Sequence, residues 1–157
     1  MPEKKKYYIA YGSNLNIRQM RYRCPDAIPF GVADLEGWQL LFKGSKTGSY
    51  LTIERKKGGR VPVAVWMVSG QDERNLDRYE GCPTFYYKKE LKLPVECFST
   101  GKIVKLTAFA YIMHEDRPFG IPNEFYVRTC AEGYHDFGFD FMPLAKAYEK
   151  SKEESGK

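Results

Sequence analysis

The chain has 157 residues, a net charge of +5 at pH 7 and an apolar fraction of 43%. This length suits one domain that buries about two thirds of its unfolded surface, so we expect a single domain over residues 1–157. The apolar fraction argues against a disordered chain, and no apolar run is long enough to cross a bilayer. Because no secretory leader is recognisable, we expect a cytoplasmic protein without membrane contact.

The first predicted strand ends in an informative turn. An apolar, β-prone run at residues 8–11 breaks into Gly12, Ser13 and Asn14, and a basic, helix-compatible segment follows over residues 17–23. Gly12 permits a close backbone approach or a positive φ, and Ser13 and Asn14 are favoured helix N-caps. Such a turn can present free N–H groups to an anion. A well-capped structural turn is the alternative interpretation.

Short β-prone runs follow the first helix and are separated by turns rich in Gly, Ser and Lys. They predict a meander with strands at residues 30–35, 38–42, 50–54 and 61–68. Gly58 and Gly59 lie between the last two runs and form the strongest hairpin signal in the chain. We therefore expect the chain to reverse direction at these two glycines.

A second helix and a second pair of strands follow the meander. Residues 71–79 have helical character, with acidic residues early and Gly81 as the C-cap. Residues 86–95 and 102–113 are predicted strands, joined by a turn at residues 99–101. On the helix, the charged residues at positions 77 and 78 are expected to face water.

Two more helices are predicted in the last third of the chain. Asn123 is expected to cap a helix that runs to Glu132, and a final helix is expected over residues 141–152. The charged tail over residues 151–157 is expected to fray. About six short strands with few helices favour barrel closure, which removes aggregation-prone edges. We predict an α+β fold, with a small closed or nearly closed mixed β-barrel and flanking helices.

The second helix ends on a carboxylate that is followed by aromatic residues. Glu80 and Gly81 close the helix, and Phe85, Tyr86 and Tyr87 come shortly after it. At the last turn of a helix a carboxylate meets the negative end of the macrodipole, and neighbouring rings can shield it from water. Both effects raise a carboxyl pKa, so Glu80 is predicted to titrate above a free glutamate. An exposed helix-end glutamate is the alternative.

Taken together, the turn and the helix end resemble the γ-glutamylcyclotransferase family. Residues 11–14, Tyr-Gly-Ser-Asn, are similar to its substrate-binding turn, and residues 80–81 are similar to its catalytic Glu-Gly pair. Tyr126 falls where the family has a later substrate-facing tyrosine. Neither short match is specific alone, but their order and spacing agree over most of the chain. The resemblance implies the same barrel with helices packed around it.

The resemblance also implies an enzyme that performs acyl transfer with ring closure. A γ-glutamyl amide, either a γ-glutamyl amino acid or a γ-glutamylamine, would become 5-oxoproline and a free amine. The substrate's own α-amine attacks the γ-carbonyl, so the protein needs no nucleophile and supplies orientation, proton transfer and oxyanion stabilisation. Glu80 is implied as the general base and then the general acid.

The residues implied to bind the substrate are Tyr11, Gly12, Ser13, Asn14, Leu15, Tyr87 and Tyr126. Tyr86 competes with Tyr87 for the same role. Whether the turn holds the α-carboxylate or the oxyanion stays open, and so does the identity of the leaving amine.

The sequence gives no reason to expect a metal or a cofactor. The four cysteines are far apart and form no Cys-x-x-Cys pair, and the chain has only two histidines. We expect a small-molecule γ-glutamyl substrate as the partner and no metal site. A homodimer is left open.

Two other functions were weighed against catalysis. A non-catalytic barrel domain that binds a small carboxylate at the glycine turn is the main alternative. A nucleic-acid-binding barrel ranks last, because the basic residues are dispersed and no single-strand-binding motif interleaves the aromatic residues. Basic residues gather in three places, namely Lys4–Lys6, the run Lys56, Lys57 and Arg60, and the first predicted helix with Arg18, Arg21 and Arg23. The helical arginines are interpreted as a solvated face.

Overall fold

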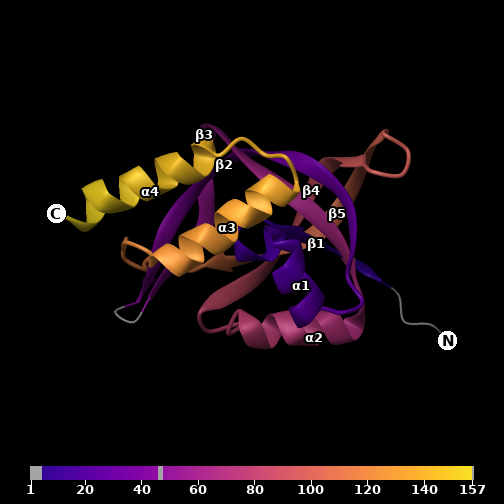
Figure 1. Ribbon diagram of the computed structural model, residues 1–157, viewed down its shortest axis with the longest axis horizontal. Coiled ribbons are helices and arrows are strands. Elements are labelled where there is room, and N and C mark those ends of the chain that lie inside the picture. Colours follow the sequence, from indigo (N-terminus) through magenta and orange to yellow (C-terminus); the bar gives the residue numbers. More distant parts are fainter. Residues whose placement is uncertain (1–4, 46–47, 157) are drawn as a thin grey trace.

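Five strands of the described chain close into a mixed barrel in the order β1-β3-β2-β4-β5 (Figure 1). The structure is a computed structural model that describes residues 5–45 and 48–156. Lys4 of the basic run and residue 157 of the predicted tail therefore lie outside the described residues. The strands are β1 (Lys6–Ala10), β2 (Ile28–Ser45), β3 (Gly48–Val68), β4 (Tyr86–Cys97) and β5 (Ile103–Met113). The predicted α+β barrel is confirmed.

The barrel closes through two short contacts. β1 pairs with β5 in parallel at Tyr8 and Phe109, whereas the other strand pairs are antiparallel. β2 meets β4 at Gly31 and the following residue, opposite Cys97 and Glu96. A Cβ atom at Gly31 would collide with the carbonyl oxygen of Glu96, so this crossing requires glycine.

Two long strands replace the four short strands of the predicted meander. β2 and β3 pair from Ile28 opposite Met67 to Ser45 opposite Gly48. The predicted hairpin at Gly58 and Gly59 is wrong, because both residues lie within β3.

The glycine pair serves a bulge inside the long ladder. Glu36 pairs with Arg60 and Trp38 pairs with Arg55, so one residue of β2 faces four residues of β3. Gly58 has a φ of 79°, a left-handed conformation that glycine adopts without strain. The local signal for a special backbone was therefore real, but the chain continues in the same direction through it.

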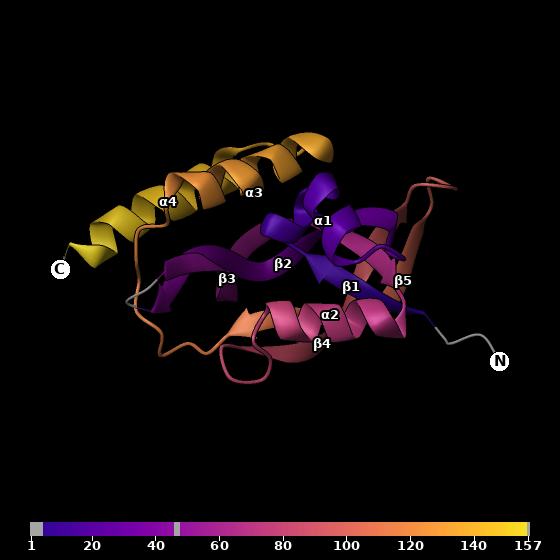
Figure 2. The same cartoon turned by 60° about the horizontal axis from the view of Figure 1, so that its bottom comes forward.

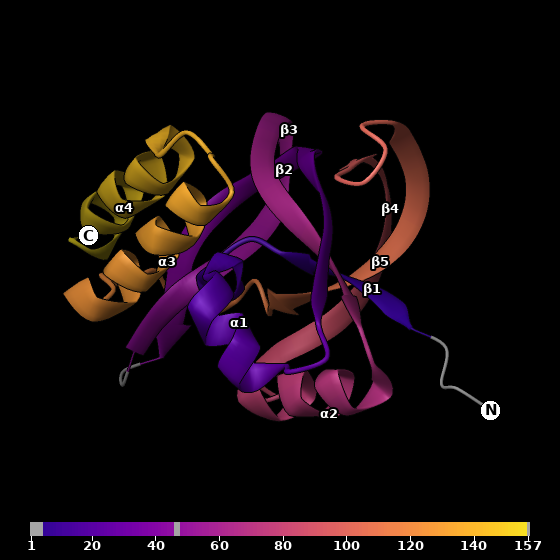
Figure 3. The same ribbon diagram turned by 45° about the vertical axis from the view of Figure 1, so that its right-hand side comes forward.

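Four helices of the described chain flank the barrel. They are α1 (Ile17–Arg23), α2 (Gly70–Tyr79), α3 (Glu124–Asp136) and α4 (Met142–Ser155). α3 and α4 lie side by side over β2 and β3, while α2 runs along β4 on the other side (Figure 2). α1 reaches down to α2, so these two helices meet at one end of the molecule (Figure 3). None of the helices in the described ranges is long and apolar enough to span a membrane.

The predicted cap of α3 is confirmed, but α3 runs to Asp136 instead of Glu132, and α4 also runs beyond its predicted end. Asn123 caps α3 by accepting a hydrogen bond from the Tyr126 N–H at 2.8 Å, as expected. α4 continues to Ser155, three residues beyond the predicted end, and Ser151 is fully buried. A regular helix therefore occupies most of the segment that was expected to fray.

Candidate active site

A cavity of about 450 Å³ opens where the end of α2 meets the turn after β1. Its described lining is mostly aromatic. Seven tyrosines contribute to it, namely Tyr8, Tyr11, Tyr50, Tyr79, Tyr86, Tyr111 and Tyr126. Two charged side chains, Arg78 and Glu80, also belong to the described lining. The cavity is thus an aromatic chamber with a single carboxylate.

The turn after β1 forms a short 3₁₀ helix over Ser13–Leu15. Its first hydrogen bond runs from the Leu15 N–H to the Gly12 carbonyl oxygen at 3.0 Å. The N–H groups of Ser13 and Asn14 come before that bond, so they have no partner within the turn. Because Gly12, Ser13 and Asn14 line the cavity, this turn offers it backbone donors.

The predicted capping role of Ser13 and Asn14 is wrong. Asn16 caps α1 instead, and its side-chain oxygen accepts a hydrogen bond from the Gln19 N–H at 3.1 Å. The 3₁₀ turn occupies the two predicted cap residues and moves the start of the helix further along the chain. Their side chains are therefore free for other contacts.

Gly12 is required for close packing rather than for its dihedral angles. Its φ is −131°, so the positive φ considered from the sequence is not used. A Cβ atom at Gly12 would lie 3.3 Å from Leu51 Cδ1 and 3.4 Å from Tyr126 Oη. These contacts support the predicted close backbone approach, and they bring the turn against β3 and α3.

Leu15 lies outside the cavity lining, although it was predicted to bind substrate. Its side chain is fully buried against Gly133 of α3, where an added Cβ would approach Leu15 Cβ to 2.6 Å. Its N–H is already bound within the turn. Leu15 therefore anchors the turn to α3.

The side chain of Asn14 joins the turn to Glu80. Its Nδ2 donates to Tyr8 Oη at 2.8 Å and to Glu80 Oε1 at 3.4 Å. Its Oδ1 accepts a hydrogen bond from Arg23 Nη1. Asn14 is only 2% exposed, so these protein contacts take the place of water.

Helix α2 ends in a Schellman motif that aims Glu80 at the cavity. The Cys82 N–H donates to the Asp77 carbonyl oxygen at 2.9 Å, and the Gly81 N–H donates to the Arg78 carbonyl oxygen at 3.3 Å. Gly81 has a φ of 63°, which this motif requires of the residue after the helix. The predicted helix-ending role of Gly81 is confirmed, and Glu80 occupies the last position before the chain turns away.

Burial raises the pKa of Glu80 to about 7, and the nearby charge of Arg23 lowers it only in part. The direction agrees with the prediction, and shielding from water is its main cause. Burial also raises the pKa of the surrounding phenols further above the ordinary tyrosine value, so they stay neutral. These phenols are Tyr8, Tyr11, Tyr86, Tyr111 and Tyr126.

Tyr126 and Tyr86 hold the same backbone segment of β3 from two sides. Tyr126 Oη accepts a hydrogen bond from the Leu51 N–H at 3.1 Å, and Tyr86 Oη donates to the Leu51 carbonyl oxygen at 2.8 Å. Both tyrosines line the cavity. Tyr126 therefore lies in the cavity, beside the glycine turn.

Tyr87 does not reach the cavity, contrary to its predicted role. Its ring packs near His114, with 5.0 Å between the ring centroids. Successive residues of a strand point to opposite faces, so Tyr86 shares a face with Lys88, which contacts α2, and Tyr87 does not. Of the two tyrosines, Tyr86 lines the cavity and Tyr87 does not.

A second polar network lies beneath the cavity and fixes α2 to the barrel. Tyr111 Oη donates to Asp77 Oδ1 at 2.6 Å, and Lys88 Nζ contacts the same oxygen at 2.9 Å. Lys88 also binds Glu73 at 2.6 Å, and Glu73 contacts Lys6 at 3.0 Å. Asp77 was expected to face water, and its side chain is 38% exposed, but its carboxylate is also bound by two partners.

Several residues near the site were missed by the sequence analysis, including Ser45, Leu51 and Arg78 of the cavity lining. Tyr8, Tyr50 and Tyr111 line the cavity, and Arg23 contacts Asn14. The three tyrosines lie in predicted strands, where nothing local separates a core tyrosine from a cavity tyrosine. Arg23 was assigned to a solvated face because its partners are distant in sequence.

The described residues contain no group of three or more His, Cys, Asp or Glu side chains that could hold a metal ion. The four cysteines are free thiols. The polar groups that the described lining of the cavity presents are backbone N–H groups, phenols, serine hydroxyls, an amide, a guanidinium group and one carboxyl group. This set is suited to binding a small anion and to moving protons.

Comparison with known proteins gives a consistent result. Residues 8–128 match the family described as Gamma-glutamyl cyclotransferase, AIG2-like. The chain is 32% identical to Gamma-glutamylcyclotransferase of Bos taurus over 87% of this chain and 72% of the relative. It is 28% identical to Gamma-glutamylcyclotransferase of Homo sapiens over 94% of this chain and 81% of the relative. A solved Gamma-glutamyl cyclotransferase superposes with a TM-score of 0.70 at 27% identity, covering 95% of this chain and 87% of that chain.

Proposed function

The chain belongs to the gamma-glutamyl cyclotransferase, AIG2-like family, and we propose on this basis that it converts a γ-glutamyl amide to 5-oxoproline and a free amine. The observation that carries the proposal is the position of Glu80. Its carboxyl group, with a pKa raised to about 7, faces an aromatic cavity beside a turn with backbone donors. A family member that retains this carboxylate has the group that the reaction needs.

Glu80 acts as both base and acid in the proposed reaction. As a carboxylate it takes a proton from the substrate's α-ammonium group, and the freed amine attacks the γ-carbonyl carbon. A five-membered tetrahedral intermediate forms, with negative charge on the former carbonyl oxygen. Glu80 then gives this proton to the leaving nitrogen as the carbon–nitrogen bond breaks. The ring nitrogen loses its second extra proton to Glu80, which passes it to the departing amine, so that 5-oxoproline and an ammonium product leave and Glu80 is again a carboxylate. A carboxyl pKa near the working pH suits a group that must both accept and donate a proton.

The glycine turn supplies the anion-binding part of the proposed site. The N–H groups of Ser13 and Asn14 are held by the fold, so they can bind an anion with little reorganisation. Either the substrate's α-carboxylate or the developing oxyanion can occupy this position. A γ-glutamyl amide analogue without the α-carboxylate separates the two, since it would lose affinity only if the turn binds that group.

The rest of the cavity excludes water and bends the substrate. A volume of about 450 Å³ lies within the range of roughly 300–1,000 Å³ that is typical of small-molecule sites. Tyr50 packs edge-on against Tyr126 and Phe85, with ring centroids 5.1 Å and 6.1 Å apart. This aromatic wall starts at Tyr126, beside the glycine turn, and extends to Phe85, and the leaving amine would pack against it.

The experiment that tests the proposal is product analysis on a panel of substrates. Purified protein would be incubated with γ-glutamyl amino acids and γ-glutamylamines, and 5-oxoproline and glutamate would be measured by mass spectrometry. The proposal predicts 5-oxoproline and the matching amine from at least one substrate, and none from Glu80→Gln. Release of glutamate would mean attack by water and would contradict ring closure. Saturable binding without any product would support the alternative of a carboxylate-binding barrel.

A further inference from the structure

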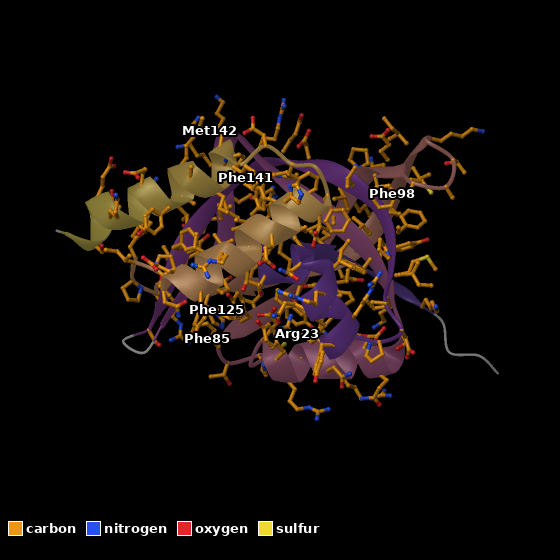
Figure 4. The ribbon with its side chains drawn as sticks, in the orientation of Figure 1. Arg23, Phe85, Phe98, Phe125, Phe141 and Met142 are labelled. Carbon is orange, nitrogen blue, oxygen red and sulfur yellow. The ribbon has the colours of Figure 1, made fainter. Side chains whose placement is uncertain are left out.

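Arg23 is the last residue of α1, and its guanidinium group lies between α1 and α2 (Figure 4). The group stacks on the ring of Tyr79, with 3.5 Å between the guanidinium carbon and the ring centroid. One nitrogen donates to Asn14 Oδ1, and another donates to Gln19 Oε1 at 3.1 Å. The backbone oxygen of Arg23 accepts from Asn75 Nδ2 at 3.1 Å. These contacts define the position of the guanidinium group closely.

The contact with Arg23 fixes the orientation of the Asn14 amide. A guanidinium group has donors but no acceptor, so only the amide oxygen can face it. The NH₂ group must then point the other way, toward Tyr8 and Glu80. A rotated amide would place its oxygen against the Glu80 carboxylate and its NH₂ group against a cation. Because Asn14 is only 2% exposed, water has little access to relieve either contact.

Arg23 also provides the positive charge that opposes the burial of Glu80. The titratable and charged groups that face Glu80 come from every surrounding element. They are Tyr8 and Tyr11 from β1 and its turn, Tyr50 from β3, Tyr86 from β4, Tyr111 from β5, Tyr126 from α3, and Arg78, Tyr79 and Cys82 at the end of α2. The shifted phenols and the Cys82 thiol have raised pKa values, so they are uncharged near pH 7 and do not stabilise a carboxylate by charge.

We propose that Arg23 is a positioning residue for Glu80. It fixes the orientation of the Asn14 amide, and its charge keeps a fraction of the Glu80 carboxyl group ionised. The inference rests on the proposed function, in which Glu80 must begin as a base. The inference gives a role to Arg23, the arginine of helix α1 that is partly buried, whereas Arg18 and Arg21 are exposed. Arg23 does not touch the substrate cavity itself, so it acts through Asn14 and through its charge.

Replacing Arg23 by a neutral residue should make Glu80 harder to ionise. The loss of a nearby positive charge disfavours the carboxylate form, so the pKa of Glu80 rises further above its ordinary value. At pH 7 a smaller fraction of Glu80 can then act as a base. At pH 9 most of the Glu80 carboxyl group is ionised in both the variant and the parent, so the difference in activity between them should be smaller.

The test compares Arg23→Gln, Arg23→Lys and Arg21→Gln. Arg21 lies on the same helix and is exposed, so its variant removes the same formal charge without the contact to Asn14. The first readout is the titration of the Glu80 carboxyl carbon by NMR of ¹³C-labelled protein, assigned by its loss in Glu80→Gln. We expect Arg23→Gln to raise the midpoint by about half a pH unit or more, Arg23→Lys to restore most of the shift, and Arg21→Gln to match the parent.

The second readout is kcat/KM at pH 7 and pH 9 with the best substrate. We expect Arg23→Gln to lose about twofold or more at pH 7, the loss of carboxylate that a rise of half a unit from a pKa of about 7 gives, and clearly less at pH 9. An equal loss at both pH values, with an unmoved carboxyl titration, would show that Arg23 only holds two helices together and would overturn the inference. A moved titration in a protein that turns over no substrate would support the link to Glu80 while removing the proposed function. Arg23→Lys, which keeps the charge, serves if Arg23→Gln fails to fold.

Discussion

Two carboxylates of helix α2 lie seven positions apart and have opposite surroundings. Partial burial acts to raise the pKa of Glu73, but hydrogen bonds from Lys88 and Lys6 outweigh it and hold the pKa below its usual value. Burial raises the pKa of Glu80 to about 7, and Arg23 offsets only part of this effect. One carboxylate is therefore fully ionised at neutral pH, and the other is divided between two protonation states.

The comparison shows that burial alone does not decide what a carboxyl group can do. A buried carboxylate with lysine partners joins a helix to a barrel and stays charged. A buried carboxyl among phenols has no such partner, so it can exchange a proton near neutral pH at a cost in stability. The same helix thus uses Glu73 for structure and offers Glu80 for chemistry.

The largest expected effect is the difference between Glu80→Gln and Glu73→Gln in turnover. General acid–base catalysis typically contributes about 10²–10⁴-fold, and Glu80 performs both proton transfers, so Glu80→Gln should lower kcat by about 10³-fold or more. Glu73→Gln should retain kcat within a few-fold. Steady-state kinetics of both variants on one substrate check this, with circular dichroism to verify folding. Similar losses of kcat in the two variants would contradict the different roles assigned to Glu80 and Glu73.

The pH dependence of stability should also separate the two residues. Between pH 4.5 and about 7, Glu80 is ionised in the unfolded chain but still protonated in the folded one, so its contribution to stability falls as the pH rises. The free energy of unfolding of Glu80→Gln should therefore be about 1–3 kcal/mol higher than that of the parent at pH 8. Near pH 4 the two free energies should be equal.

Glu73→Gln should show the opposite trend. The pKa of Glu73 is lowered in the folded state, so its stabilising contribution exists above its unfolded pKa and disappears as the pH falls through the folded value. The variant should be about 1 kcal/mol less stable than the parent at pH 7, with a smaller difference in acid. Urea unfolding at several pH values measures both trends, and parallel curves for the two variants would contradict the assignment.

A loss of stability is also expected from Lys88→Met. The change removes the ammonium group shared by Glu73 and Asp77, and leaves two partly buried carboxylates with fewer partners. We expect a loss of about 2 kcal/mol in the free energy of unfolding at pH 7. Lys89→Met is the matched control, because Lys89 is exposed and points to the opposite face of β4. Equal losses in both variants would show that the network does not fix α2.

The smallest expected effect concerns which tyrosine, Tyr86 or Tyr87, faces the substrate. Tyr86→Phe removes the buried hydrogen bond to the Leu51 carbonyl oxygen, so it should cost about 1 kcal/mol of stability and raise KM a few-fold. Tyr87→Phe should change neither by a measurable amount, because its ring lies by His114 and outside the cavity lining. The reverse order of effects would restore Tyr87 as the substrate-facing residue.

Features that depend on a few neighbouring residues were predictable from the sequence. Gly81 ends α2 and Asn123 caps α3 as expected, since a helix end is determined by backbone groups within one turn. Glu80 and the glycine turn were identified because their residue types carry the resemblance to the family. The closed barrel followed from the number of short β-prone segments.

Features that depend on distant contacts were not predictable in the same way. Gly58 and Gly59 signal an unusual backbone, but only pairing with β2 makes it a bulge rather than a turn. Tyr111 and Asp77 are 34 positions apart in the sequence and form a hydrogen bond, and Arg23 stacks on the ring of Tyr79 at the end of another helix. The register and packing of the folded chain create these contacts, so no local sequence pattern predicts them.

The pH dependence of kcat/KM tests the central claim most directly, because it reports the pKa values of essential groups in the free enzyme. If Glu80 is the base and its pKa is about 7, activity should rise through a midpoint near pH 7, and the residual activity of Glu80→Gln should lack that rise. A midpoint near 4.5, the ordinary glutamate value, or the same rise in Glu80→Gln would contradict the account.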